Sequence, residues 1–384
     1  MNVVVTGIGL LSCLGDLTES WQSLLAGKSG IKLHQPFPAF APRPLGLIDQ
    51  TPISLSSLTE QLVHTALKDA NLTTPLAECG VVMGSSRGYQ AVWEQWLTSI
   101  ARHHPRQTSP PDYSSIRLES WLDHLPHHCA IATARLLGST GPVLAPMAAC
   151  ATGIWAIAQG VELIQQGRCQ RVIAGAVEAP ITPLNLASFE QMGALATTGC
   201  YPFDHKREGL VLAEGGAVFV LESEANAAQR GALIYGRVLG FGLTCDAYHV
   251  SAPDRNFHSA AMAVKQCLER SCLLNSDIDY IHAHGTSTQL NDHREAQLIK
   301  HLFSHRVAVS STKGATGHTL GASGAMGIAF SLMALRHQQL PPCVGLQESA
   351  FDLNLITQPQ QQTICSVLCF GFGFGGQNAV IALA

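Results

Sequence analysis

The chain has 384 residues, of which 46% are hydrophobic and only 13% are charged. This balance excludes an intrinsically disordered protein and favours a folded chain with a large core. The formal net charge is −4, from 23 basic and 27 acidic residues, and no long basic run occurs, so we expect no binding to nucleic acid. The 12 cysteines form no C-x-x-C pair and the 17 histidines no H-E-x-x-H motif, so we expect no metal site.

The first residues, MNVVVTGIGLLSCLG, lead into a strand and a turn without a positively charged leader, so we expect no signal peptide. The most apolar later stretch, residues 319–335, is diluted by Gly and Ser and predicts no membrane span. We therefore expect a cytoplasmic protein, in which cysteines stay reduced and mostly serve as small buried hydrophobic residues.

Short apolar strands alternate with helical patterns along the chain, which predicts a layered α/β fold. The stretch 103–115, which contains three prolines, is predicted to be an exposed loop. The stretch 223–231 is expected to connect two halves of the fold. In chain order, the predicted elements are strand 2–7, helices 16–26 and 56–70, strand 79–84, helix 151–166, strands 171–177 and 217–222, helix 257–272, strand 279–284, helix 292–303, strand 307–311, helix 320–336 and strand 378–383.

The segment PMAACATGIWAI, residues 146–157, places Cys150 between small residues and ahead of an amphipathic helical pattern. Apolar residues recur at helical spacing until Gly167, which supplies a helix stop. At a helix N-terminus, unpaired N–H groups and the helix dipole stabilise negative charge, so we expect a lowered pKa for the Cys150 thiol. Taken alone, this stretch fits a nucleophile and a buried core cysteine equally well.

Three later segments place polar residues or glycines where strands end or begin. HAHGTSTQLND carries His284 at a strand end, and SSTKGATGHTLGASGAMGIAF carries Lys313 and His318 in a glycine-rich turn. FGFGFGGQNA, residues 370–379, is a glycine-rich turn before the last strand. Each has an ordinary structural explanation by itself: a hydrogen-bonded core histidine, a solvated lysine and a tight turn.

In this order the motifs resemble those of the β-ketoacyl-acyl-carrier-protein synthases, the elongating condensing enzymes with a Cys-His-His set. The resemblance covers nearly the whole chain, from VVVTGIGLLSCLG through ACATG, PFDHKREG, AEGG, DAYHVSAP, HGTST and STKGATGHTLGASGA to FGFGG. It implies the α/β thiolase fold, with two similar α/β halves in a five-layered α-β-α-β-α arrangement. We place the halves at residues 1–223 and 224–384. A dimer is also implied, of two identical chains or with a ketosynthase homologue.

The resemblance further implies decarboxylative condensation of an acyl thioester with malonyl carrier protein, in fatty acid or polyketide-type elongation. Cys150 would take the acyl group as nucleophile, and His284 and His318 would stabilise the enolate formed by decarboxylation. Lys313 matches the family's motif lysine, an electrostatic and structural support. Phe372 matches the mobile gating phenylalanine, and the N–H groups of Cys150 and Phe372 would form the oxyanion hole.

The implied partner is an acyl carrier protein, whose 4′-phosphopantetheine carries the substrates, so no bound cofactor is expected. By the same resemblance the carrier is acidic and meets a basic rim on the synthase. Lys206 and Arg207, in the motif PFDHKREG, are the candidate docking residues. The alternative is that Arg207 forms an internal ion pair and Lys206 is merely solvated.

Several positions depart from the family pattern without touching the three catalytic candidates. The departures predict a specialised synthase rather than the main housekeeping enzyme. They are Ala148 for a Thr or Ser before the nucleophile, Gly327 for a glutamate, Phe370 and Gly371 for Asn-Ser, Gln377 for a Thr, and a segment 31–60 without the usual arginine-containing stretch.

Three other functions stay open at this stage. A chain-length-factor-like partner subunit of a heterodimeric ketosynthase commonly lacks the nucleophilic cysteine, which is intact here. A thiolase normally uses a second cysteine near the C-terminus, and Cys369 is the candidate, but the flanking FGFGG favours a synthase. A cysteine hydrolase needs one histidine oriented by Asn or Asp, which two histidines on separate turns fit poorly.

Overall fold

The structure is a computed structural model that describes residues 1–103, 116–304 and 306–384. The loop predicted at 103–115 therefore lies outside the described residues, apart from His103, which ends a helix. Among the described helices, none combines the length and apolar character that crossing a bilayer requires.

The predicted alternation of strands and helices is confirmed, with shifts of a few residues at the ends of elements. The strands are β1 (Val3–Ser12), β2 (Gly15–Asp16), β3 (Lys32–His34), β4 (Arg43–Leu45), β5 (Gly80–Gly84), β6 (Val143–Leu144), β7 (Arg171–Glu178), β8 (Gly215–Ser223), β9 (Gly236–Cys245), β10 (Tyr280–His282), β11 (Ala308–Ser310), β12 (Gln339–Leu340), β13 (Asn354–Leu355), β14 (Gln360–Gln361), β15 (Val367–Gly373) and β16 (Gln377–Leu383). The α-helices are α1 (Leu17–Leu25), α2 (Leu55–Asp69), α3 (Gln90–His103), α4 (Leu118–Leu122), α5 (His128–Leu137), α6 (Thr152–Gln165), α7 (Pro183–Gln191), α8 (Glu224–Gln229), α9 (His258–Ser271), α10 (Gln289–Leu302), α11 (Lys313–Thr316) and α12 (Ser323–His337).

The two halves of the fold repeat one strand pattern. The order β6-β5-β7-β8-β1 has two parallel pairings followed by two antiparallel ones, and β11-β10-β15-β16-β9 has the same sequence of pairings. β1 and β9 also pair with each other, at Val3 with Val238 and Val5 with Gly236. Hydrogen bonding thus runs from one half into the other, and the described strands include one continuous 12-stranded sheet.

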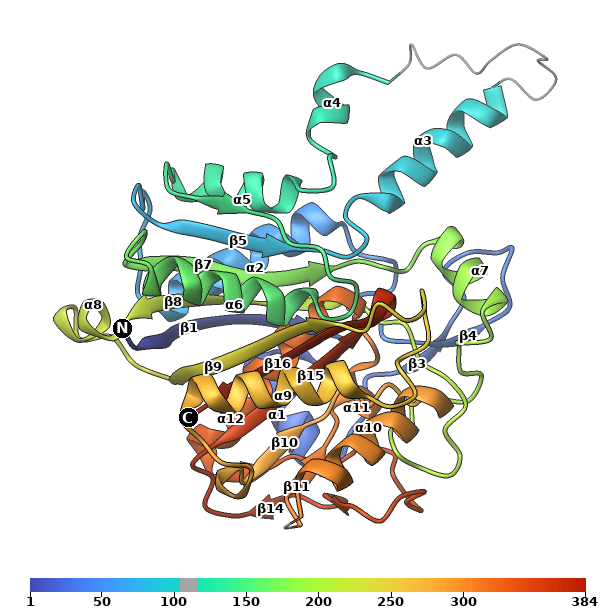
Figure 1. Ribbon diagram of the computed structural model, residues 1–384. Helices are drawn as coiled ribbons and strands as arrows, with labels where there is room; N and C mark the ends of the chain where they lie inside the picture. The colour runs from blue at the N-terminus through green and yellow to red at the C-terminus, as the bar shows by residue number, and fades with distance from the viewer. Residues whose placement is uncertain (104–115, 305) are drawn as a thin grey trace.

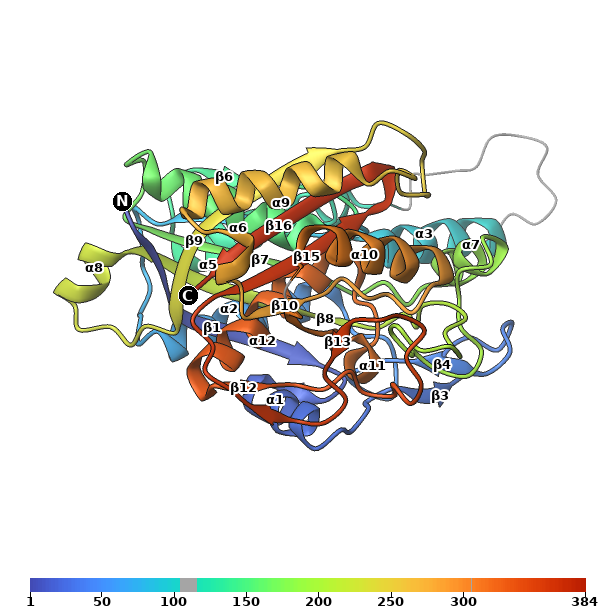
Figure 2. The ribbon, with the colours of Figure 1, turned by 60° about the horizontal axis from the view of Figure 1, so that its bottom comes forward.

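Helices cover both half-sheets and fill the space between them, which gives five layers (Figures 1 and 2). α2 and α5 pack on the outer face of the N-terminal half, and α9 packs on β9 and β16 at the outer face of the other half. α6 and α12 lie in the middle layer, where they contact each other. The predicted α-β-α-β-α arrangement is confirmed, whereas the boundary placed at residue 223 stays a prediction.

Two of the longer strands, β9 and β15, escaped prediction because their glycines resemble those of turns. In β9, a Cβ on Gly242 would lie 1.8 Å from the carbonyl oxygen of Ala263, so glycine is needed for α9 to approach the sheet. In β15, a Cβ on Gly371 would lie 2.9 Å from the side chain of Ile154 in α6. These glycines mark close packing of layers, a tertiary demand that a local pattern does not display.

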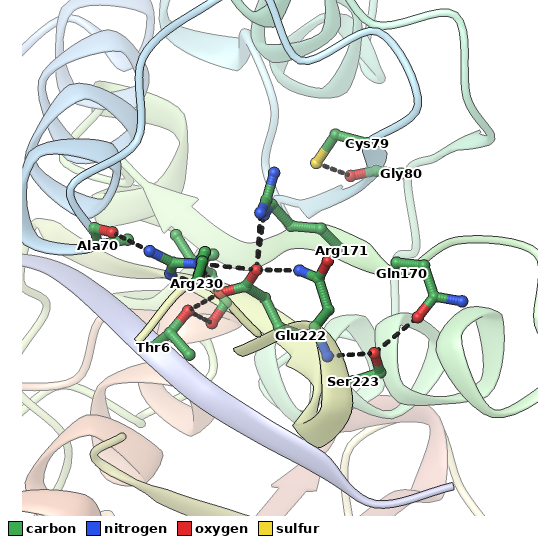
Figure 3. A network of polar contacts seen from close by, with 11 residues as sticks. Thr6, Ala70, Cys79, Gly80, Gln170, Arg171, Glu222, Ser223 and Arg230 are labelled. Carbon is green, nitrogen blue, oxygen red and sulfur yellow. Dashed lines mark hydrogen bonds and ion pairs between the residues drawn. The ribbon is translucent and has the colours of Figure 1, made fainter. Parts of the chain in front are cut away.

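A buried carboxylate fixes the segment that connects the halves (Figure 3). Glu222, at the end of β8, is fully buried and accepts hydrogen bonds from Thr6 at 2.7 Å, Arg171 at 2.9 Å and Arg230 at 2.9 Å. Arg230 also donates to the carbonyl oxygen of Ala70 at 2.7 Å. The connection 223–231 is therefore tied to β1, β7 and the end of α2, and most of it forms α8.

Replacing Glu222 with Gln is expected to lower the free energy of unfolding by about 3–5 kcal/mol, because two arginines would lose their buried counter-charge. Burial raises the pKa of Glu222, but hydrogen bonds from Arg230, Thr6 and Arg171 and the Arg171 charge outweigh it and hold the pKa below its ordinary value. The stabilisation is therefore present above the unfolded-state pKa and is lost as pH falls through the native one. Urea denaturation at several pH values measures it, and an equal loss in the control Glu269→Gln, from an exposed pair with Lys265, would contradict it.

Candidate active site

Cys150 lies in a strained turn between β6 and α6. Ala149, just before it, has a φ of 46°, in the left-handed region that costs energy for a residue with a side chain. Thr152 holds this turn, since its hydroxyl accepts from the Ala148 N–H at 2.9 Å and donates to the Ala149 carbonyl at 2.7 Å. Cys150 is 9% exposed and lines a cavity of about 320 Å³. The strained backbone at Ala149 therefore places the Cys150 thiol at the cavity.

Close packing of the two central helices brings the halves of the site together. A Cβ on Gly153 of α6 would lie 2.4 Å from the backbone nitrogen of Ala325 in α12, and one on Gly324 would lie 2.8 Å from Ile154. The N-terminal ends of α6 and α12 therefore meet without intervening side chains. Cys150 precedes α6 and His318 precedes α12, so the two residues meet although 168 positions separate them along the sequence.

His284 and His318 converge on the thiol as the motifs predicted. The Sγ atom of Cys150 and one ring nitrogen from each histidine all lie within 4.8 Å of one another, and the histidine rings are 5.4 Å apart, edge to face. His318 Nδ1 lies 2.7 Å from the Ser323 hydroxyl. Burial, and after it the charge of Lys313, holds the pKa of both histidines well below 6.5. Both rings are therefore neutral, each with one N–H donor and one acceptor nitrogen.

A thiol and two imidazoles at this separation also suit a metal ion such as Zn²⁺. The sequence motifs predict none, and that expectation stays a prediction.

Lys313 is buried, so it is not the solvated lysine of the alternative explanation. Its ammonium group donates a hydrogen bond to the carbonyl oxygen of His284. On the other side of that residue, Glu295 accepts from the N–H groups of His284 at 2.6 Å and Gly285 at 2.7 Å. Burial lowers the pKa of Lys313, an effect that Glu295 opposes, and burial raises the pKa of Glu295 to about 7. Lys313 and Glu295 thus clamp the backbone that carries His284.

The expected lowering of the Cys150 pKa is wrong. Burial raises the pKa of the thiol to about 11, against the lowering effects of the Lys313 and Arg87 charges and the Phe374 N–H. The start of α6 does not compensate for the loss of water around the sulfur. The thiol therefore keeps its proton until a group beside it accepts that proton.

The backbone N–H group that lowers the pKa of the Cys150 thiol belongs to Phe374, two residues beyond Phe372. Gly373 permits this approach, because a Cβ there would lie 2.8 Å from the Ala148 carbonyl oxygen. The Phe374 ring stacks on Phe189 at 6.2 Å and lines the cavity. Phe372 also lines the cavity, with its ring 6.0 Å from that of His284. Phe374 is a site residue that sequence reasoning missed, and its place directly before the glycine pair was the signal.

Glu178 was also missed, although it holds the turn that follows His318. It ends β7, is fully buried, and accepts from the Ser85 hydroxyl at 2.7 Å and the Arg87 N–H at 3.0 Å. It also accepts from the Gly321 N–H at 3.0 Å, in the turn after His318. One carboxylate thus ties the loop after β5 to the turn that carries the second histidine.

The two docking candidates differ in environment. Lys206 is exposed, and its ammonium group donates to the Gln347 side chain at 2.6 Å. Arg207 is only 8% exposed, donates to the Asp204 carbonyl oxygen at 2.9 Å and lies over the Phe351 ring at 4.7 Å. Arg207 is therefore internal, as the alternative held, although its contacts are a carbonyl oxygen and an aromatic ring rather than an ion pair. Lys206 remains the candidate for docking.

The competing functions fit the geometry less well. Cys369 is fully buried and does not line the cavity of Cys150, unlike the second cysteine of a thiolase. Within the part of the chain that the structure describes, no Asp or Asn side chain hydrogen-bonds either histidine ring, as a hydrolase would require.

Comparison with known proteins gives the same family as the motifs. Two family models match, "Beta-ketoacyl synthase, N-terminal domain" over residues 51–227 and "Beta-ketoacyl synthase, C-terminal domain" over residues 235–347. The chain is 34% identical over 412 residues to 3-oxoacyl-[acyl-carrier-protein] synthase 2 of Synechocystis, covering 99% of this chain and 97% of the relative. It is 32% identical over 417 residues to the protein of that name from Coxiella burnetii, covering 100% and 98%.

Solved structures of ketosynthases share the fold of this chain over its whole length. A type II polyketide ketosynthase in complex with its acyl-carrier protein matches with a TM-score of 0.93 at 28% identity, covering 100% of this chain and 98% of that one. The ishigamide ketosynthase/chain length factor matches with a TM-score of 0.92 at 26% identity, with the same coverage. Fold and site together define a condensing acyltransferase of the thiolase fold. Within that class, the chain belongs to the beta-ketoacyl synthase family.

Proposed function

We propose that the protein is a β-ketoacyl-acyl-carrier-protein synthase, which condenses an acyl group held on Cys150 with a malonyl group held on a carrier protein. The observation that carries this proposal is the meeting of one thiol and two neutral imidazoles at a single cavity. The thiol can hold an acyl group, and two N–H donors can stabilise an enolate. The relatives, named 3-oxoacyl-[acyl-carrier-protein] synthase 2, support the same reaction.

In the first step, Cys150 Sγ attacks the carbonyl carbon of an acyl thioester on the carrier. The bond to the carrier sulfur breaks, and the thiol proton passes through a neutral histidine to the departing carrier thiolate. A thiol with a pKa of about 11 needs such an acceptor. The N–H groups of Cys150 and Phe374 stabilise the oxyanion of the tetrahedral intermediate.

In the second step, the malonyl thioester loses its carboxylate as CO₂, and the electron pair of the broken C–C bond moves to the thioester enolate. The N–H groups of His284 and His318 donate to the enolate oxygen as charge develops there. In the third step, the enolate carbon attacks the acyl carbonyl on Cys150. A C–C bond forms, the C–S bond breaks, and the cysteine thiolate takes a proton from water through a neighbouring histidine.

The active unit is a dimer, with a second copy or a homologous subunit. β6 is the end strand of the sheet, and its Leu144 is 36% exposed. Met147, three residues before Cys150, is 61% exposed. A partner seated on this edge would cover both residues and help to wall the cavity. The ishigamide ketosynthase, described together with a chain length factor, is a similar protein with a partner subunit. The cytoplasm is the fitting location, because the described cysteines are all free thiols.

A condensation assay tests the proposed function. The purified protein is supplied with malonyl carrier protein and a series of acyl carrier proteins of increasing chain length, and products are read by mass spectrometry. β-Ketoacyl carrier protein and CO₂ are expected, from a species with the mass of two chains. Product formed only in the presence of a co-purified homologue, and unchanged by Cys150→Gln in this chain, would instead favour the partner-subunit function, and no product in either preparation would overturn the proposal.

Replacing Lys206 with Glu is expected to raise KM for carrier-bound substrate several-fold and to leave KM for a small pantetheine thioester unchanged. An exposed rim charge acts on encounter with an acidic carrier, and salt screens that effect. Steady-state kinetics at low and high ionic strength measure it. Lys68→Glu, on α2 at the outer face, is the matched control. Equal losses with both substrates would show that Lys206 supports the fold or the site instead.

A further inference from the structure

His282 is a third buried histidine beside the site, and the proposed reaction gives it no part. It lies on β10, two residues before His284, and is 2% exposed. It does not line the cavity. Its Nε2 atom lies 3.1 Å from the Thr312 hydroxyl, and its Nδ1 atom lies 3.8 Å from the Cys369 thiol. The ring is therefore held by polar contacts, behind the residues that face substrate.

Gly327 on α12 lies beside this ring, with no room for a side chain between them. A Cβ added to Gly327 would lie 2.8 Å from both Nδ1 and Cε1 of His282, and 2.8 Å from the Cys369 sulfur. No side chain fits at position 327 while His282 keeps its place. Position 327 is where the resembling enzymes usually carry a glutamate. In this chain the His282 ring, which comes from β10, fills the space in which such a side chain would begin.

The contacts of His282 lead to Lys313. Thr312, its hydrogen-bond partner, is the residue directly before Lys313 and caps the short helix α11. Lys313 in turn donates to the carbonyl oxygen of His284. A path thus runs from the His282 ring to the Thr312 hydroxyl, along the backbone to Lys313, and through the Lys313 hydrogen bond to the backbone of a proposed catalytic histidine.

We propose that His282 is a positioning residue that holds Lys313 in place through Thr312, in the role that a side chain from position 327 would otherwise fill. The proposal rests on the proposed function for its effect on turnover. Glu295, which accepts from the His284 N–H, is the charged group that acts most strongly on the Lys313 ammonium. A neutral ring at this place adds no second negative charge, so the ammonium charge stays available to the Cys150 sulfur and to a developing enolate.

Two substitutions break the same hydrogen bond from opposite ends. His282→Phe keeps a ring without polar atoms, and Thr312→Val keeps the volume without the hydroxyl. Each is expected to slow iodoacetamide alkylation of Cys150 at fixed pH, and to lower kcat per titrated thiol, by about tenfold, because small displacements of a positioned group are costly. KM for the acyl primer is expected to change less than twofold. Thr65→Val, on α2, removes a hydroxyl bonded only to its own helix and is the control.

A second pair of variants tests the shared space. Gly327→Glu alone is expected to lose folded protein or melting temperature, and His282→Ala in the same chain is expected to restore part of that loss, since the two side chains compete for one volume. Additive losses would show that they do not. Parental alkylation rate and kcat in both His282→Phe and Thr312→Val would overturn the positioning role. Alkylation that responds in a protein that forms no condensation product would instead count against the proposed function alone.

Discussion

Replacing Cys150 with Gln is expected to abolish condensation, by a factor of at least about 10³, while malonyl decarboxylation stays measurable. Condensation requires an acyl group on the thiol, and among the described residues Cys150 is the one cysteine that lines the cavity shared by His284 and His318. Decarboxylation requires only the two imidazole donors, which the substitution leaves in place. The glutamine amide also fills the space that the acylated thiol would use, so the cavity keeps its shape.

The two activities are measured separately, as ketoacyl product by mass spectrometry and as labelled CO₂ released from malonyl carrier protein. Cys245→Gln is the control, because this cysteine is exposed and lies outside the cavity. Residual condensation near the parental rate would show that Cys150 does not carry the acyl group. Loss of both activities together would show that the thiol takes part in decarboxylation as well.

Replacing His318 with Ala is expected to lower the rate of malonyl decarboxylation by about 10²–10³-fold, the usual loss when one donor to a developing oxyanion is removed. His318 is buried and neutral, so its donor is already in place and desolvated before charge develops. Acylation of Cys150 is expected to suffer less, because the oxyanion of that step is stabilised by backbone N–H groups. Ser323→Ala, which removes the partner of His318 Nδ1, should give a smaller loss of the same kind.

Rapid-quench measurement of CO₂ release, beside the rate of acyl transfer to Cys150, separates these effects. His64→Ala, on the exposed side of α2, provides the matched control. A variant of His318 that decarboxylates at the parental rate would show that the enolate forms elsewhere. A loss confined to acyl transfer would assign His318 to the first step only.

The site could be predicted from sequence where its chemistry sits in contiguous motifs. Cys150, His284 and His318 each lie in a turn that precedes a helix, within a segment that contains glycine, and the structure brings all three to one cavity. The sequence could not show whether Phe372 or Phe374 places its N–H near the sulfur, because both lie in the same glycine-rich segment. The path of the backbone shows that it is Phe374. Local pattern identified the segment, and three-dimensional structure identified the residue.

Electrostatics and burial were predicted least well, since they depend on residues distant in the chain. The pKa of Cys150 was expected to fall because it precedes a helix, yet burial by both halves raises it. The local sequence predicts Lys313 to be a surface charge. In the structure it is buried, because the segment that follows β10 covers it and supplies the His284 carbonyl and Glu295. The glycines of β9 likewise signal a turn until α9 is placed against them.

The central claim, that Cys150 carries the acyl group, is tested most directly by mapping the covalent adduct. The protein is incubated with an acyl carrier protein thioester in the absence of malonyl substrate, digested, and sequenced by mass spectrometry. We predict one acyl group per chain, on Cys150, discharged when malonyl carrier protein is added. An adduct on another of the 12 cysteines, with Cys150 unmodified, would contradict the assignment of this site.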